Sequence, residues 1–156
     1  MYPRDTTPAN MNSSNQGSRR INLTRIAHVY YTHKDIEKAI QFLEDFGFQE
    51  AKRVGKNIYY HGTGPEPFVY CARHGDEDEF GGAAFAVESQ ADLDYASQTL
   101  PGASKVTAVT DAPGGGYRVT FRDPVDNFPF HLVWGQELSD DVKKLPELDY
   151  NMVSRL

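Results

Sequence analysis

The chain carries one structural pattern twice, and this duplication limits the folds it can adopt more than any other feature. Residues 23–31 are β-branched and aromatic, as is typical of a strand, and apolar residues within 36–46 then recur at spacings of three and four, which predicts a one-sided helix. Strand-like runs follow at 48–54, 57–61 and 67–73, with turn residues between them. The first half therefore predicts the order β-α-β-β-β.

The second half repeats this order, with an apolar strand at 83–88 followed by a weaker helical pattern that ends at Pro101. The start of this helix, DLDYA at 92–96, matches DIEKA at 35–39 in the first half. The remaining strands are expected at 105–111, 117–122 and 128–134. A single βαβββ unit exposes a sheet face that a twin unit can cover, so the sequence predicts an α+β domain of two modules. An unrelated α+β sandwich is the alternative.

The two ends of the 156-residue chain differ from its middle. Residues 1–20 contain no Leu, Ile, Val or Phe, and such a segment is expected to be a disordered tail. Residues 137–156 are expected to form a C-terminal arm that packs on the body or on a second copy. The domain itself is expected at 21–136, with modules at about 21–75 and 80–136.

Helix-capping residues support the two predicted helices. Thr32 followed by Asp35 fits a capping box at the first helix, and Gly47 supplies its C-terminal stop. Ser89 followed by Asp92 offers the same cap to the second helix.

Composition excludes several classes of function. The net charge of −6 argues against a nucleic-acid partner, because such a protein needs a basic face. No uncharged apolar run approaches the ~20 residues that a membrane span requires, so no membrane partner is expected. Cys71 is the single cysteine and cannot form an internal disulfide, and residues 1–20 lack an apolar signal region. These observations predict a cytoplasmic protein.

Three stretches of sequence resemble a known family: RIAHVYYTHKDIEKAIQFLEDFGF at 25–48, GGAAFAVES at 81–89 and FRDPVDNFPFHLVWG at 121–135. They are similar to motifs of the vicinal oxygen chelate superfamily, which includes glyoxalases, bleomycin-resistance proteins and type I extradiol dioxygenases. The resemblance covers roughly residues 21–136 and is strongest to the N-terminal half of two-domain dioxygenase-like proteins. Nothing here corresponds to their C-terminal half, which usually carries the iron.

The resemblance implies a central cavity between two half-barrels, with metal ligands from the first strand of each module and from the last strand. Those positions hold His28, Gly82 and His131 in this chain, so one ligand is kept, one is lost and one is exchanged for the expected Glu. A metal site normally needs at least three protein ligands. No cofactor is therefore expected; the alternative is a divalent iron, zinc or manganese ion held by His28 and His131.

Alternation of side chains along strands gives an independent prediction of the cavity face. His28 is expected to share its face with Ile26 and Tyr30, and His131 with Val133. The same alternation puts small residues on the cavity face of the second module's first strand, namely Gly82, Ala84 and Ala86. Two histidines opposite small side chains, which leave room, predict a pocket.

Two pocket histidines without metal suggest acid–base chemistry, because imidazole titrates near neutrality. We expect His28 and His131 to catalyse an isomerase, cyclase or lyase reaction on an aromatic or polyketide-like compound. The expected substrate-binding residues are Tyr30, Tyr60, Tyr70, Tyr117, Arg118, Gly82 and Ala84. Among them the tyrosines would stack on the ligand, and Arg118 would anchor an anion.

Each of these features also has a plain structural interpretation. A histidine on a strand can be a hydrogen-bonded structural residue, and aromatic pairs such as Tyr59-Tyr60 can be core. Two other functions stay open: a non-catalytic ligand-binding or dimerisation module, and an iron(II) extradiol dioxygenase or a fragment of one. Since this superfamily often pairs modules between subunits, a homodimer is expected.

Overall fold

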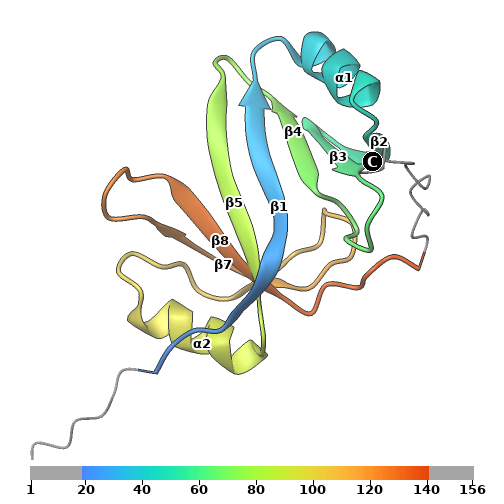
Figure 1. Cartoon of the computed structure of the whole chain (residues 1–156). Coiled ribbons are helices and arrows are strands. Elements are labelled where there is room, and N and C mark those ends of the chain that lie inside the picture. The colour runs from blue at the N-terminus through green and yellow to red at the C-terminus, as the bar shows by residue number, and fades with distance from the viewer. Residues whose placement is uncertain (1–18, 141–156) are drawn as a thin grey trace, which may run out of the picture.

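Eight strands form one curled sheet against which two helices pack (Figure 1). The structure, a computed structural model, describes residues 19–140. The elements are β1 (Leu23–His33), α1 (Ile36–Asp45), β2 (Gln49–Val54), β3 (Asn57–His61), β4 (Tyr70–His74), β5 (Glu79–Val87), α2 (Gln90–Thr99), β6 (Thr107–Ala108), β7 (Tyr117–Arg122) and β8 (Pro129–Trp134). The predicted α+β class and the repeated βαβββ order are confirmed.

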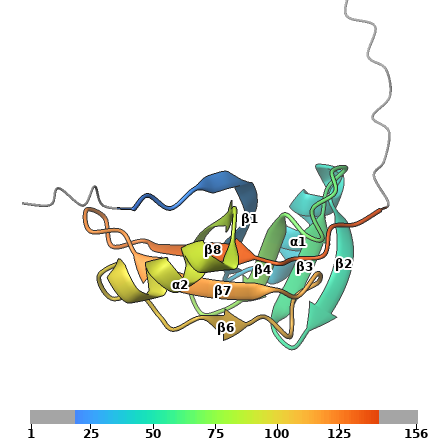
Figure 2. The ribbon, with the colours of Figure 1, turned by 90° about the horizontal axis from the view of Figure 1, so that it is seen from below.

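The strand order is β2-β3-β4-β1-β5-β8-β7-β6, so each module contributes four neighbouring strands. The two modules join where β1 pairs antiparallel with β5, while β1–β4 and β5–β8 are the parallel pairs. The two helices belong to different modules and lie over separate parts of the sheet (Figure 2).

The helices begin and end largely where the capping residues predict. Ser89 caps α2 by accepting a hydrogen bond from the Asp92 backbone at 3.2 Å, as expected. The cap of α1 is Asp35, whose carboxylate accepts from the Lys38 backbone at 3.1 Å. Thr32 lies inside β1 instead, so the expected capping box is wrong: the strand runs two residues further than the sequence pattern indicated.

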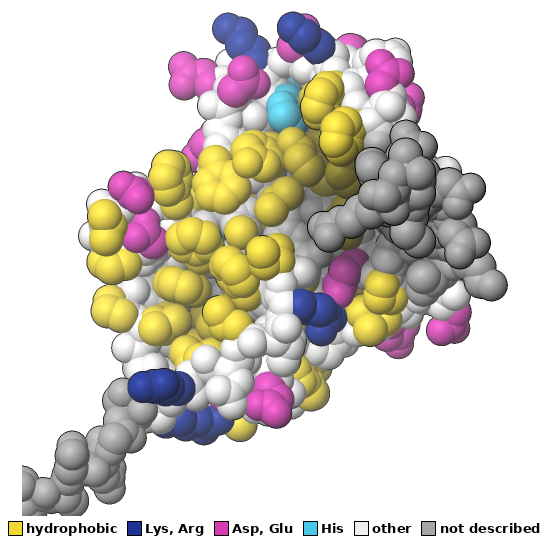
Figure 3. All heavy atoms as spheres, in the orientation of Figure 1, with side chains coloured by type: hydrophobic (Ala, Val, Ile, Leu, Met, Phe, Trp, Pro, Cys, Tyr) yellow, Lys and Arg dark blue, Asp and Glu magenta, His cyan; other side chains and the backbone are white. Residues whose placement is uncertain are grey.

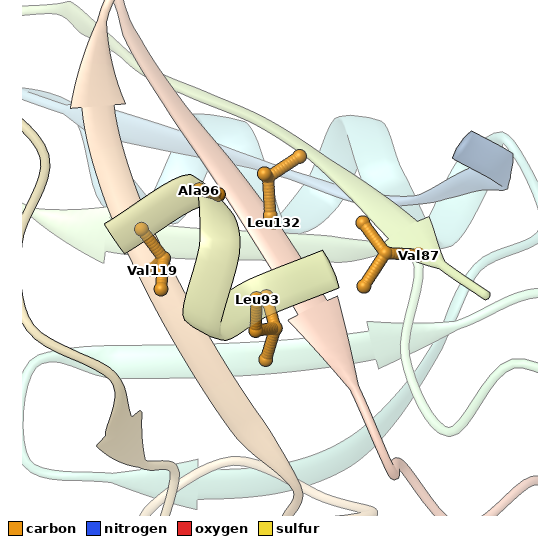
Figure 4. Packing of buried hydrophobic residues seen from close by; sticks show 5 residues of the cluster. All are labelled: Val87, Leu93, Ala96, Val119 and Leu132. Atoms are coloured by element: carbon orange, nitrogen blue, oxygen red, sulfur yellow. The ribbon is translucent and has the colours of Figure 1, made fainter. Parts of the chain in front are cut away.

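Each helix covers its own part of the core. Leu93 and Ala96 of α2 pack on Val87, Val119 and Leu132, which come from three different strands (Figure 4). Under α1, the buried residues are Leu43, Ile58, Tyr60 and Ala72. Burying a leucine, isoleucine or valine side chain contributes ~1.5–3 kcal/mol to the stability of the fold. A few such contacts therefore attach each helix to the strands of its module.

A β-bulge in β1 changes the predicted alternation. Ile26 pairs with Phe85 and His28 pairs with Ala84, so Ala27 has no partner of its own. The extra residue turns Ile26 away from the face of His28, and its side chain is 67 % exposed. The prediction that Ile26 and His28 share a face is therefore wrong. The predicted strand at 105–111 is also too long, because β6 contains two residues.

An apolar surface follows the helix-bearing side of the central strands (Figure 3). Ring contacts run from α1 across β4, β1 and β5 to the start of β8. We call this the outer aromatic face; its members are Phe42, Phe46, Phe48, Tyr70, Tyr31, Phe80 and Phe128. Several of these side chains are strongly exposed, Phe46 by 74 %.

The predicted tail and arm lie mostly outside the described residues. Of the tail, the structure describes Arg19 and Arg20, and Arg19 forms an ion pair of 3.0 Å with Asp92. Of the arm, it describes residues 137–140. Within residues 19–140 no helix is long and apolar enough to cross a membrane.

Candidate functional site

A cavity of about 200 Å³ lies on the face of the sheet opposite the helices. It is lined by Tyr30, Thr32, Cys71, Arg73, Gly81, Arg118 and His131; Tyr31 borders it as well, although its ring contacts Tyr70 and Phe80 in the outer aromatic face. Alternation explains this placement: Ala72, beside Cys71, packs under α1, and Leu132, beside His131, packs under α2. Strands from both modules thus build the cavity, as the duplicated pattern predicted.

Tyr30 stands between the two predicted histidines. The centroid of its ring is 5.1 Å from that of His28 and 5.0 Å from that of His131. Its hydroxyl lies 3.0 Å from His28 Nε2 and accepts a hydrogen bond of 3.4 Å from Arg118 Nη1. Tyr30 therefore connects both histidines and the arginine to the cavity.

His28 lies behind Tyr30, where it is shielded from solvent. Its side chain is 2 % exposed, and its ring lies against Phe68 with 4.0 Å between the ring centroids. Its Nδ1 atom has no hydrogen-bond partner within residues 19–140. Burial, helped by the charges of His131 and Arg118, lowers the pKa of His28 to about 3. His28 is thus a neutral ring at physiological pH.

His131 lines the cavity, but both of its ring nitrogens are bonded. Nε2 lies 3.0 Å from the Gly81 carbonyl oxygen, which can only accept, so Nε2 carries the hydrogen. Nδ1 then accepts from the Thr120 hydroxyl at 2.9 Å. Burial lowers the pKa of His131, against the opposing effect of the Gly81 carbonyl and with the help of Arg118. The ring is fixed in one tautomer.

Gly82 faces these rings without leaving room, which corrects the expectation of open space beside it. A Cβ atom there would lie 2.2 Å from the Pro129 carbonyl oxygen and 2.9 Å from His131 Nε2. The φ angle of +106° also disfavours any other residue. Ala84 and Ala86 likewise pack in a buried cluster with Val133. The small residues of β5 thus allow neighbouring strands and side chains to approach closely.

Three predicted substrate-binding tyrosines lie outside this cavity. Tyr60 is fully buried under α1, and Tyr70 packs beside it, with its hydroxyl 2.9 Å from His33 Nε2. Tyr117 stacks on Trp134 with 6.4 Å between centroids and is 42 % exposed. Of the predicted binding residues, the cavity contains Tyr30 and Arg118.

Sequence reasoning missed several residues of the site. Arg73 lies two positions after Cys71 on β4, so alternation alone places both side chains on one face, and this signal could have found it. Thr120, which holds His131, stands opposite it in the β7–β8 ladder. Cys71 also lines the cavity; it is 1 % exposed, and burial raises the pKa of its thiol to about 12.

The residues present do not fit a three-ligand metal site. No group of three or more potential ligands (His, Cys, Asp or Glu) occurs within the described part of the chain, residues 19–140. Both nitrogens of His131 already have partners, and His28 Nε2 is bonded to Tyr30. At the lost position, Gly82 cannot be replaced by a ligand without moving β8. A metal would have to displace existing hydrogen bonds.

Comparison with solved structures shows the same fold in longer proteins. The Mn(II)-bound glyoxalase from Novosphingobium aromaticivorans is 25 % identical, with a TM-score of 0.73, over 82 % of this chain and 44 % of that chain. Homoprotocatechuate 2,3-dioxygenase from Arthrobacter globiformis is 20 % identical, with a TM-score of 0.66, over 78 % and 39 % of the two chains. A variant of that enzyme from B. fuscum gives 19 % identity and a TM-score of 0.66, over 78 % and 35 %.

The two dioxygenases show likeness of fold alone, and this chain spans less than half the length of all three proteins. No curated protein matches the chain by sequence. The family described as the glyoxalase/bleomycin resistance protein/dioxygenase superfamily matches residues 25–132, which is most of the domain. Together with the paired βαβββ modules, this match establishes that the chain belongs to the glyoxalase/bleomycin resistance/dioxygenase superfamily.

Proposed function

We propose that the chain is a small-molecule enzyme in which Tyr30, supported by His28, His131 and Arg118, transfers a proton to a substrate in the cavity. The observation that carries this proposal is the hydrogen-bonded series His28–Tyr30–Arg118, which ends at a cavity lined by Tyr30, Arg118 and His131. The expected direct acid–base pair of histidines is thereby revised: the histidines position Tyr30, and the phenol reacts.

The tautomer of His28 decides what Tyr30 can do. If Nδ1 carried the hydrogen, a buried N–H group would have no partner, which is the costlier arrangement. We therefore assign the hydrogen to Nε2, which donates to the Tyr30 oxygen. That oxygen then receives two N–H donors, from His28 and Arg118, and the phenolic hydrogen is free to point into the cavity.

This arrangement suits a general acid. Burial raises the pKa of Tyr30, against the opposing charge of Arg118, so the phenol is protonated at neutral pH. Tyr30 can donate its hydrogen to a carbonyl oxygen or to a leaving hydroxyl, and the same two N–H donors stabilise the phenolate that remains. The substrate gives up a proton from carbon to water, and water returns that proton to Tyr30, so that the proton count balances over one turnover. An isomerisation, cyclisation or dehydration of an aromatic or polyketide-like compound meets this requirement.

The proposal is tested by turnover of a panel of small aromatic and polyketide-like carbonyl compounds. We expect activity that survives a chelator and falls by about 10²–10⁴-fold in Tyr30→Phe, the range expected for loss of a general acid. Tyr117→Phe is the matched control, because Tyr117 lies outside the cavity. Activity that a chelator abolishes and that iron or manganese restores would instead favour the dioxygenase-like alternative.

A non-catalytic ligand-binding module is the second candidate. It is favoured by His131, whose two nitrogens are both satisfied in a structural arrangement. Tight binding of a panel compound without turnover, at any pH between 5 and 9, would support this alternative over the enzyme.

We also propose that the protein is a cytoplasmic homodimer, with the outer aromatic face covered by a second copy. The exposed rings of this face, with Phe42 62 % and Phe46 74 % exposed, offer a contiguous apolar surface that a second copy can bury. Light scattering of the wild type and of Phe46→Asp tests this: a dimer that becomes a monomer in the variant supports it, and a wild-type monomer at micromolar concentration contradicts it. Exposed Val125→Asp, outside this face, is the control.

A further inference from the structure

Two arginines line the same small cavity, and neither forms an ion pair within residues 19–140. Arg73 comes from β4 of the first module and Arg118 from β7 of the second. The ion pairs in the described part of the chain involve Arg19, Arg25 and Arg53 instead. Unpaired guanidinium groups at a cavity are unusual in a chain of net charge −6, where carboxylates outnumber cations.

Each of these arginines uses little of its hydrogen-bonding capacity. Arg73 Nε donates to Asn57 Oδ1 at 2.8 Å, and Arg118 Nη1 donates to the Tyr30 hydroxyl at 3.4 Å. A guanidinium offers five N–H donors, so most donors of both groups are left for a ligand. Because Asn57 and Tyr30 are uncharged, these hydrogen bonds orient the two guanidinium groups without neutralising their positive charges.

The carboxylate whose titration responds to Arg118 is engaged elsewhere. Asp111 Oδ2 accepts a hydrogen bond of 2.8 Å from the Tyr59 hydroxyl. Burial alone would raise the pKa of Asp111. The hydrogen bond from Tyr59, backbone donors and the charge of Arg118 outweigh burial and lower this pKa. The charge of Arg118 therefore acts on Asp111 over a distance, and the two side chains form no ion pair.

The charges around the cavity are two guanidinium groups in its lining and the carboxylate of Asp111 nearby. Arg118 favours the deprotonated forms of His28, Tyr30 and His131, and both arginines act in this direction on Cys71, while Asp111 opposes them on Tyr30 and Cys71. Since no cavity-lining residue is an Asp or Glu, the positive charge there is not balanced by the lining. An anion entering the site would supply the missing charge.

We propose that Arg73 and Arg118 bind the carboxylate of a compact substrate and so orient its reacting oxygen toward Tyr30. This inference rests on the proposed function and names its substrate class. A guanidinium matches a planar carboxylate with two parallel hydrogen bonds, and two of them can grip it from opposite modules. The volume of about 200 Å³ limits the ligand to a small acid.

Binding of benzoate tests the proposal independently of turnover, with benzamide as the neutral compound of the same shape and phenyl phosphate as the alternative anion. Isothermal titration and the NMR shifts of the His131 ring report binding at this cavity. We expect benzoate to bind at least tenfold more tightly than benzamide and phenyl phosphate. Replacing an N–H donor to a charged group costs about 1.5–3 kcal/mol, so Arg118→Gln should weaken benzoate about 10- to 100-fold.

Arg73→Gln should weaken benzoate by about tenfold, and Arg118→Lys should keep part of the affinity because it keeps the charge. Arg122→Gln is the control, since Arg122 lies on the same strand and donates to the Asn127 carbonyl outside the cavity. Equal binding of benzoate and benzamide, preference for phenyl phosphate, or full affinity in both glutamine variants would overturn the proposal. Benzoate binding without any turnover in the substrate panel would uphold it while removing the proposed catalysis.

Discussion

The strands β1 and β5 hold the same place in the two modules and pair with each other, but they carry side chains of opposite size. β1 brings His28 and Tyr30 to the cavity face, and their partners across the ladder are Ala84 and Gly82. The large side chains of β1 fit because the residues opposite them on β5 are small. At Gly82 the space that a side chain would need is taken by the Pro129 carbonyl group and the His131 ring, both from β8, so the first strand of the second module serves packing at this position.

The largest expected effect comes from adding a single carbon to β5. Gly82→Ala should lower the free energy of unfolding by about 3 kcal/mol or more, because backbone strain at φ +106° adds to overlap with Pro129 and His131. Urea denaturation measures this. Gly102→Ala is the control: its φ is +66° and nothing lies within 4 Å, so a loss of about 1 kcal/mol is expected. Similar losses in both variants would show that β5 is not tightly packed.

On β1, the dry environment of His28 predicts a pH dependence. The pKa of His28 falls from 6.5 to about 3 on folding, so between these values the unfolded chain binds a proton that the folded chain does not. Stability should therefore fall as the pH falls through this window, by about 1.4 kcal/mol per pH unit, and this contribution should vanish above it.

The variant His28→Leu removes this proton and should flatten the stability profile between pH 6 and 4 by that slope. The comparison is the denaturation midpoint of variant and wild type across the same pH series. His74→Gln, at an exposed position, should leave the profile unchanged. If the stability of His28→Leu changes with pH as steeply as that of the wild type, the His28 ring is in contact with water in spite of its burial.

Removing one oxygen from β1 should have a smaller effect on stability. Tyr30→Phe deletes the partner of His28 Nε2 and of Arg118, so a loss of about 1–2 kcal/mol is expected. Calorimetric unfolding measures it, and ¹⁵N NMR should show the hydrogen of His28 moving between nitrogens. A variant as stable as the wild type with an unchanged His28 spectrum would contradict the hydrogen-bonded series.

The smallest effect is expected across the β7–β8 ladder, at the support of His131. Thr120→Val keeps the shape but removes the hydroxyl that donates to Nδ1, which should cost about 1 kcal/mol. The ring of His131 should then populate a second tautomer in NMR spectra. Thr107→Val, whose hydroxyl binds a backbone carbonyl on the exposed edge, is the control. One unchanged tautomer in Thr120→Val would show that Gly81 alone fixes the ring.

The fold was predictable because the repeat, the helix periods and the Gly and Ser caps agree with one another. The site was predictable in part. The resemblance located His28 and His131, and alternation located Tyr30 beside them. Alternation failed at Ile26 because one bulged residue reverses every side chain before it.

The tyrosines that lie outside the cavity have another cause. Tyr60 and Tyr70 suit a strand on either face, and only the position of α1 decides that Tyr60 is buried under it and that Tyr70 packs beside Tyr60. No local pattern encodes that choice. Arg73 was open to prediction, because alternation along its strand places it on the same face as Cys71, and both line the cavity.

The close contact at Gly82 has a consequence for engineering. A histidine introduced at this position would meet the backbone of β8, because its Cβ atom alone would lie 2.2 Å from the Pro129 carbonyl oxygen. A designed metal centre on this sheet would therefore need ligands at other positions, or a backbone redesigned to hold β8 further from β5.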